Sequence, residues 1–169
     1  MARPYFHFAT MLCTALLLCG GVARADIETG DGVEVVNPQR LEYVVEQVSR
    51  DGRNLGITKE QIRKIVEERL RAAGITPVDG ETAGTVNPYV YVRVVVGGEG
   101  FNIRVEFSRP VVYEVRGELF TSFGVMWSDS VTGWSTDGNY VVGALDRPMG
   151  RFIEEFRKAN RLQQSKRDE

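Results

Sequence analysis

Histidine and cysteine are almost absent from this chain, which has 169 residues but only one histidine and two cysteines. All three residues, His7, Cys13 and Cys19, lie within the first 25 residues. If that segment is removed, the remaining chain has no imidazole base, no thiol nucleophile and none of the preferred transition-metal ligands, histidine and cysteine. It also has no cysteine for a disulfide, so its stability must come from a packed core. These absences exclude the usual hydrolytic triads and thiol enzymes.

Residues 1–25 have the three zones of a secretory signal peptide, with a short positive start, an apolar run over residues 9–22 and a final Ala-x-Ala motif. The pattern predicts Sec-type export to the periplasm or the medium, with cleavage after Ala25. An uncleaved anchor is less favoured, because an apolar run of about 14 residues falls short of the roughly 20 that cross a bilayer. Acylation of Cys19 is a further alternative, although Leu18 is not the small residue that precedes the cysteine in bacterial lipoprotein signals.

Acidic residues slightly outnumber basic ones, 23 against 21, for a net charge of −2. Cleavage would remove two arginines and no acid, which leaves 19 basic residues against 23 acidic ones and a net charge of −4. This weak negative charge argues against nucleic acid or an anionic membrane as the partner. No later apolar run reaches membrane-spanning length, so we expect a soluble mature protein without a transmembrane segment.

The mature chain is long enough for one domain with a single core. Residues 26–39 carry acids, two glycines and a proline with little periodicity, and they predict a flexible N-terminal segment. Residues 40–162 then form the single α/β domain. Residues 163–169 are polar and predict a frayed tail.

Two amphipathic helices are predicted. The first begins after Thr58, which forms a capping box with Gln61, and Ile57 is placed to staple against Ile62. Apolar residues then recur at helical spacing until Gly74 ends the helix. The second helix has apolar residues at the same spacing near the end of the chain: Leu145, Met149, Phe152, Ile153 and Phe156.

Strands are predicted from β-branched and aromatic runs. Residues 89–96 and an alternating run over residues 101–115 flank a glycine-rich stretch, which is typical of a hairpin. Pro110 within the second run marks a bulge or an edge position. Residues 119–127 predict a last strand. Residues 41–48 fit both a helix and a strand by periodicity, but three valines and a tyrosine favour a strand.

These elements predict an α+β fold, an α/β sandwich. Its single, mainly antiparallel sheet of about four strands carries the two amphipathic helices on one face. If residues 41–48 pair in parallel with residues 89–96, the helix between them should make a right-handed crossover.

A set of short motifs carries a resemblance: residues 57–63 (ITKEQIR), residues 68–75 (ERLRAAGI), residues 89–92 (YVYV) and the later Trp127. Together they resemble a recurrent group of exported bacterial proteins of unknown function, over most of residues 40–160. The resemblance implies a strand at residues 41–48 and no activity. The element order is also similar to that of small periplasmic α/β domains of envelope accessory proteins, such as the N-terminal domain of the Tol-system propeller protein or activator lipoproteins of peptidoglycan synthases. That likeness implies a fold and not a function.

Residues 127–140 are the richest stretch in aromatic and polar groups outside the predicted core, and we interpret them as a loop. Sugar sites pair aromatic platforms with polar groups, so five candidate ligand-binding residues follow: Trp127, Asp129, Trp134, Asp137 and Asn139. The alternative is a loop that closes the core and turns at Asp137. Hydrolysis by the paired carboxylates of Asp129 and Asp137 is less favoured, because nothing in the sequence gives their separation. No catalytic residue, metal ligand set or cofactor is predicted.

The sequence therefore favours an exported, non-enzymatic interaction module of the bacterial cell envelope or periplasm, with an envelope protein as its partner. The missing residue types and the expected open strand edges support this reading. A small-ligand or glycan-binding protein that uses residues 127–140 is the alternative, and a carboxylate-dependent hydrolase comes third.

Overall fold

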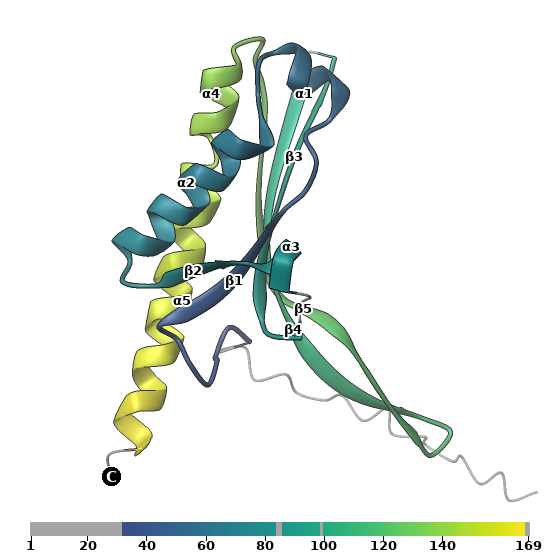
Figure 1. Ribbon diagram of the computed structural model, residues 1–169, viewed down its shortest axis with the longest axis vertical. Helices are drawn as coiled ribbons and strands as arrows, with labels where there is room; N and C mark the ends of the chain where they lie inside the picture. Colours follow the sequence, from purple (N-terminus) through teal and green to yellow (C-terminus); the bar gives the residue numbers. More distant parts are fainter. Residues whose placement is uncertain (1–31, 84–85, 99, 168–169) are drawn as a thin grey trace, which may run out of the picture.

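A computed structural model describes residues 32–83, 86–98 and 100–167 (Figure 1). The predicted signal peptide and residues 26–31 lie outside the described residues. Over the described ranges, no helix is both long and apolar enough to cross a membrane.

The sheet has five strands in the order β2-β1-β3-β4-β5. The second strand in this order, β1 (Arg40–Val45), runs parallel to both of its neighbours, β2 (Thr76–Asp79) and β3 (Tyr89–Gly97). From β3 onward, β4 (Gly100–Val115) and β5 (Glu118–Trp134) follow as an antiparallel meander. The α+β class was predicted correctly. A mixed sheet of five strands replaces the predicted mainly antiparallel sheet of about four.

The extra strand is β2, which the sequence did not reveal. It has only four residues, none of them fully buried, and its second residue is Pro77. A proline cannot donate a backbone hydrogen bond, but it is tolerated in an edge strand, and β2 is the edge next to β1. The strand at residues 41–48 is confirmed over Arg40–Val45, and it pairs in parallel with β3.

Two long helices, α2 (Lys59–Ala72) and α5 (Asp146–Arg167), cover one face of the sheet (Figure 1). The predicted capping box is present, because Thr58 Oγ1 accepts from the Gln61 N–H at 3.1 Å and Gln61 Oε1 accepts from the Thr58 N–H at 2.9 Å. Gly74 follows α2 with a positive φ of 79°. The C-terminal helix continues to Arg167, well into the segment predicted as a polar tail.

Three short helices were not predicted: α1 (Arg50–Asn54), α3 (Gly80–Ala83) and α4 (Gly138–Gly143). Ser49 shows why α1 forms. Its hydroxyl accepts from the Gly52 N–H and also bonds both backbone groups of Val96 in β3. The cap therefore fixes the start of α1 to the end of β3.

The core lies between the two long helices and the sheet. Alternate residues of β3 and β4 point into it, and the buried apolar residues of these two strands are Val90, Val92, Val94, Val96, Phe101, Ile103, Val105 and Phe107. Phe152 and Phe156 of α5 pack on Phe107, with ring centroids 5.9 and 6.2 Å away.

The N-terminal segment meets this core. Val33 is buried, and the Val35 N–H donates to Asn160 Oδ1 of α5 at 3.1 Å. Asn160 Nδ2 donates in turn to the carbonyls of Val33 and Phe156. Residues 33–35, which lie in the segment predicted to be flexible, are therefore bound to α5.

Candidate functional site

The outer parts of β4 and β5 form an arm that projects from the rest of the described structure, which we call the body (Figure 1). We define the arm as residues 109–125. Pairing between β3 and β4 ends at Tyr89 and Ser108, so beyond Ser108 the strand β4 pairs only with β5. The arm is a two-stranded ribbon, and the long helices do not extend over it (Figure 1).

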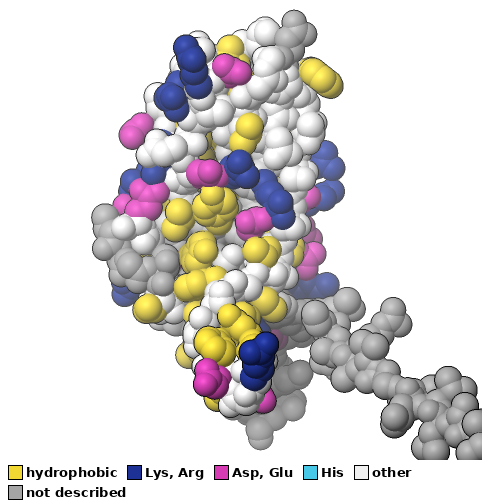
Figure 2. All heavy atoms as spheres, turned by 90° about the vertical axis from the view of Figure 1, so that its right-hand side faces the viewer, with side chains coloured by type: hydrophobic (Ala, Val, Ile, Leu, Met, Phe, Trp, Pro, Cys, Tyr) yellow, Lys and Arg dark blue, Asp and Glu magenta, His cyan; other side chains and the backbone are white. Residues whose placement is uncertain are grey.

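Seven large apolar side chains of the arm are exposed to solvent: Val112, Tyr113, Val115, Leu119, Phe120, Phe123 and Val125. Leu119 reaches 74% exposure. Large apolar side chains exposed on both faces of one ribbon are typical of an interaction site. An isolated two-stranded ribbon is at best marginally stable in water. Figure 2 shows apolar side chains gathered in the middle of the uncovered sheet face and continuing down onto the arm.

Aromatic rings are in contact on both faces of the arm. On one face, Tyr113 and Phe120 are register partners and their rings stack with centroids 5.8 Å apart. On the other, Phe123 meets Tyr89 of β3 edge to face at 5.2 Å. The second contact ties the base of the arm to the body.

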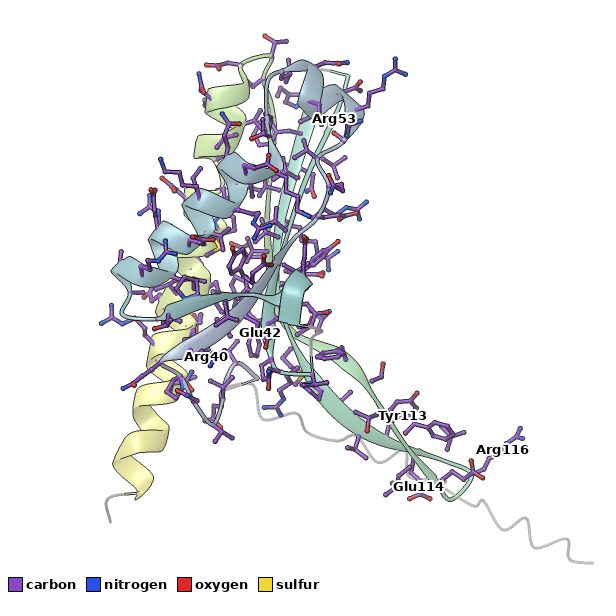
Figure 3. All side chains as sticks on the ribbon, in the orientation of Figure 1. Arg40, Glu42, Arg53, Tyr113, Glu114 and Arg116 are labelled. Carbon is purple, nitrogen blue, oxygen red and sulfur yellow. The ribbon has the colours of Figure 1, made fainter. Side chains whose placement is uncertain are left out.

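A tight turn closes the tip of the arm. Arg116 and Gly117 connect the paired residues Val115 and Glu118, and both have positive φ, at 55° and 84°. Two positive φ angles match the type I′ turn that suits a twisted hairpin. Figure 3 shows Tyr113, Glu114 and Arg116 on this outer end. The tip therefore combines an exposed aromatic ring with charges of both signs.

The arm leaves the body at a β-bulge. Phe107 pairs with Trp127, whereas the next residue, Ser108, pairs with Val125, so Met126 is the extra residue. A bulge bends the strand and increases its twist. Pro110 was expected to mark a bulge or an edge, and it lies two residues further on, where β4 has no partner on the β3 side. The edge interpretation is the one that the structure supports.

Among the described residues, no strand pairs with the outer edge of β5 along the arm. This strand ends the sheet order, and residues 119–128 form a run of ten without a charge or a proline. Natural edge strands usually carry lysine, proline or inward charges that prevent pairing with another chain. The run lacks these features, and its unpaired N–H and C=O groups can accept a further strand.

The interpretation of residues 127–140 as a loop is wrong for residues 127–134, which belong to β5. Small polar residues broke the apolar pattern there, but an edge strand tolerates them on its solvent side. Trp127 faces α5, and its ring lies 5.4 Å from that of Phe152. Trp134 is seven residues away, so it lies on the opposite face of the strand, where it is 81% exposed.

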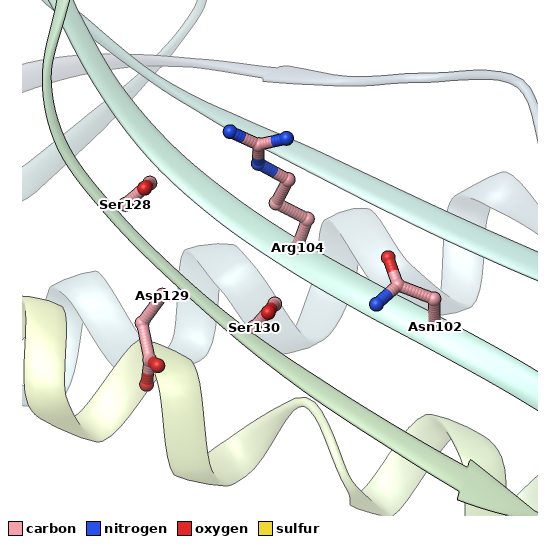
Figure 4. A pocket seen from close by; sticks show the side chains of 5 residues that line it. All are labelled: Asn102, Arg104, Ser128, Asp129 and Ser130. Carbon is pink, nitrogen blue, oxygen red and sulfur yellow. The ribbon is translucent and has the colours of Figure 1, made fainter.

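The polar candidates have structural partners. Figure 4 shows Asp129 directed toward α5, where Arg151 lies 3.4 Å away. Asp137 caps α4 by accepting from the Asn139 N–H at 2.9 Å. The structure thus places Trp127 with Asp129, and Asp137 with Asn139, while Trp134 stands on the other face. The five residues do not converge on one site.

A polar hollow on the uncovered face was missed in the sequence. It has a volume of about 290 Å³ and is lined by Asn102, Arg104, Ser128, Ser130 and, from the strand itself, Asp129, whose side chain points away toward α5 (Figure 4). Arg104 pairs with Glu106 at 2.6 Å, and Asn102 donates to Thr132 at 3.0 Å. In the sequence, polar residues alternate with apolar ones over residues 102–106. Any strand with one solvated face has this pattern, so it does not indicate a hollow.

Two tyrosines of the body are held by carboxylates. Tyr43 of β1 donates to Glu67 of α2, and Arg63 lies over its ring at 5.8 Å. Burial and the bond to Glu67 raise the pKa of Tyr43, and the same bond lowers the pKa of Glu67. Tyr91 donates to Glu46 at 2.5 Å, and burial followed by this bond raises its pKa to about 12. Both contacts join neighbouring elements of the body.

Across the described parts of the chain, no three His, Cys, Asp or Glu residues are grouped closely enough to hold a metal ion. No protein-family model matches the sequence, and no curated protein matches it either.

Proposed function

We propose that the protein is an exported interaction module of the bacterial cell envelope or periplasm, and that it binds a partner protein through the β4–β5 arm. The observation that carries the proposal is the exposure of seven large apolar side chains on a ribbon that the helices do not cover. Burying an apolar surface of this kind stabilises a complex by roughly 25 cal/mol per Å² before the costs of association.

The chemistry of the arm favours a protein over a lipid surface. Glu114 and Glu118 flank Arg116 at the tip, so an anionic membrane would meet two carboxylates for each guanidinium. The edge of β5 offers main-chain groups that a lipid cannot satisfy, whereas an extended strand can. The partner therefore presents a strand edge with apolar side chains beside it.

Site-specific photo-crosslinking in intact cells tests this proposal. A photoreactive residue at Leu119 should give one defined heterologous adduct. The matched control is Val86, which is also an exposed apolar residue but lies outside the arm. Adducts from Leu119 that contain only lipid or only a second copy of this chain, or equal adducts from both positions, would contradict the proposal.

Glycan binding is a second candidate, and the exposed indole of Trp134 favours it. The side chain lies on the uncovered face, on the same side of β5 as Ser130 and Thr132 and near the polar hollow. Titration with chitotriose should then quench the fluorescence of Trp134, and Trp134→Phe should abolish the change. An unchanged spectrum in the wild-type protein would remove this candidate.

A further inference from the structure

A second cavity lies away from the arm, where the N-terminal segment passes β1. Its volume is about 420 Å³. The polar lining comes from Asn37, Arg40, Glu42 and Asn87, and Val35, Val36 and Pro88 contribute to the apolar wall. No residue of the arm lines it.

Glu42 is the unusual member of this lining. The residue is 6% exposed, and its Oε1 accepts from Asn87 Nδ2 at 2.6 Å. The other oxygen, Oε2, is buried and has no hydrogen-bond partner in the described part of the chain. Burying a polar atom without a partner is destabilising, and more so when the group is charged. Because Glu42 lines the cavity, a donor bound there, preferably a cation, can supply the bond that this oxygen lacks.

Arg40 supplies the opposite charge. It is two residues from Glu42 on β1, so both side chains leave the same face of the strand. Figure 3 marks both residues on this strand. Among the described residues, Arg40 forms no ion pair, and neither does Glu42. The cavity thus holds two opposite charges that do not neutralise each other.

We propose that this cavity binds a small zwitterion, with its ammonium group at Glu42 Oε2 and its carboxylate at Arg40. The ammonium group supplies the hydrogen bond that the buried oxygen lacks. Because Arg40 and Glu42 are not in contact, the two charges of the ligand are separated by several bonds, as in an ω-amino acid. The apolar side chains of Val35, Val36 and Pro88 lie along the methylene groups between them.

A matched set of four-carbon probes tests each half of the proposal: γ-aminobutyrate, n-butylammonium and butyrate. Titration of the ¹⁵N-labelled protein, followed by amide chemical shifts, should show the tightest binding for γ-aminobutyrate. The shifts should centre on residues 37–42 and 87. Glu42→Gln keeps the shape and the acceptor for Asn87, and it should weaken γ-aminobutyrate at least about tenfold, because a charge-assisted bond is lost.

Arg40→Gln removes the guanidinium and keeps Glu42, so it tests the contribution of Arg40 alone. Arg40 is exposed, so this variant should fold normally, and it should bind γ-aminobutyrate no better than n-butylammonium. Glu106→Gln removes a carboxylate from the same sheet face outside the cavity and should leave binding unchanged. Equal binding of γ-aminobutyrate by wild type and Glu42→Gln, a preference for butyrate, or no shift with any probe at millimolar concentration would overturn the proposal. The arm variant Leu119→Lys should bind normally, so this proposal and the docking proposal can fail separately.

Discussion

The body and the arm share the strand β4 but differ in what covers it. Phe107 in the body is fully buried, whereas Tyr113 in the arm is in the same phase of the same strand and is 46% exposed. Apolar residues occupy the odd positions of β4 in both parts, from Phe101 to Phe107 in the body and from Val111 to Val115 in the arm. Only the first part lies beneath α5 (Figure 1). An alternating pattern therefore specifies which side chains share a face, but it does not specify whether that face is covered.

The largest expected difference between the two regions is in stability. Phe107→Ala should lower the free energy of unfolding by about 3–5 kcal/mol, because it leaves a cavity against Phe152 and Phe156. Tyr113→Ala should cost less than about 1 kcal/mol, since half of its side chain is already in water and only one ring contact is lost. Urea denaturation measures both. Similar losses at the two positions would mean that the arm is part of the cooperative core.

A smaller effect is expected where the body holds the N-terminal segment. Asn160→Ala removes the acceptor of the Val35 N–H and the donor to the Val33 carbonyl. Unpaired buried backbone groups should lower the unfolding free energy by about 1–3 kcal/mol. Asn102→Ala is the matched control, because the hydrogen bond from Asn102 to Thr132 is exposed and its loss should cost less. If both variants are equally stable, Asn160 does not anchor the segment.

The body was largely predictable because its signals are local. Thr58 and Gln61 are three residues apart and define the start of α2 without any tertiary contact. The hairpin of β3 and β4 follows from two β-branched runs around glycines. The short strand β2 was not predicted because its four residues, which include Pro77, show no strand periodicity. Its pairing depends on β1, which lies more than thirty residues earlier.

The arm and the cavity were less predictable because both depend on distant parts of the chain. Residues 109–125 are apolar in both phases, which in a sequence also describes a buried strand. The isolation of Glu42 Oε2 depends on Asn87 and on the course of the N-terminal segment. Trp127 and Trp134 were predicted to lie in one loop, but both belong to β5, where they lie on opposite faces.

The arm should matter for binding and hardly at all for folding. Leu119→Lys places a charge in the uncharged edge run of β5, and it should reduce capture of the partner at least about tenfold in a pull-down. Its unfolding free energy should stay within about 0.5 kcal/mol of wild type, because Leu119 is exposed. Val86→Lys changes an equally exposed apolar residue outside the arm and should capture normally. Equal capture of the partner by both variants would show that binding does not depend on the arm.

The smallest effect is confined to alkaline solution and to the body. The pKa of Tyr91 is raised from 10.0 to about 12 in the folded protein, so its contribution to stability is complete below pH 10. That contribution is lost as the pH rises from 10 to about 12, because the unfolded chain releases the proton first. Tyr91→Phe removes this proton and should flatten the loss of stability over that range, whereas Tyr140→Phe, at an exposed position of α4, should leave the wild-type slope. Urea midpoints measured at successive pH values distinguish the two, and an unchanged slope in Tyr91→Phe would show that the bond to Glu46 does not hold the tyrosine proton.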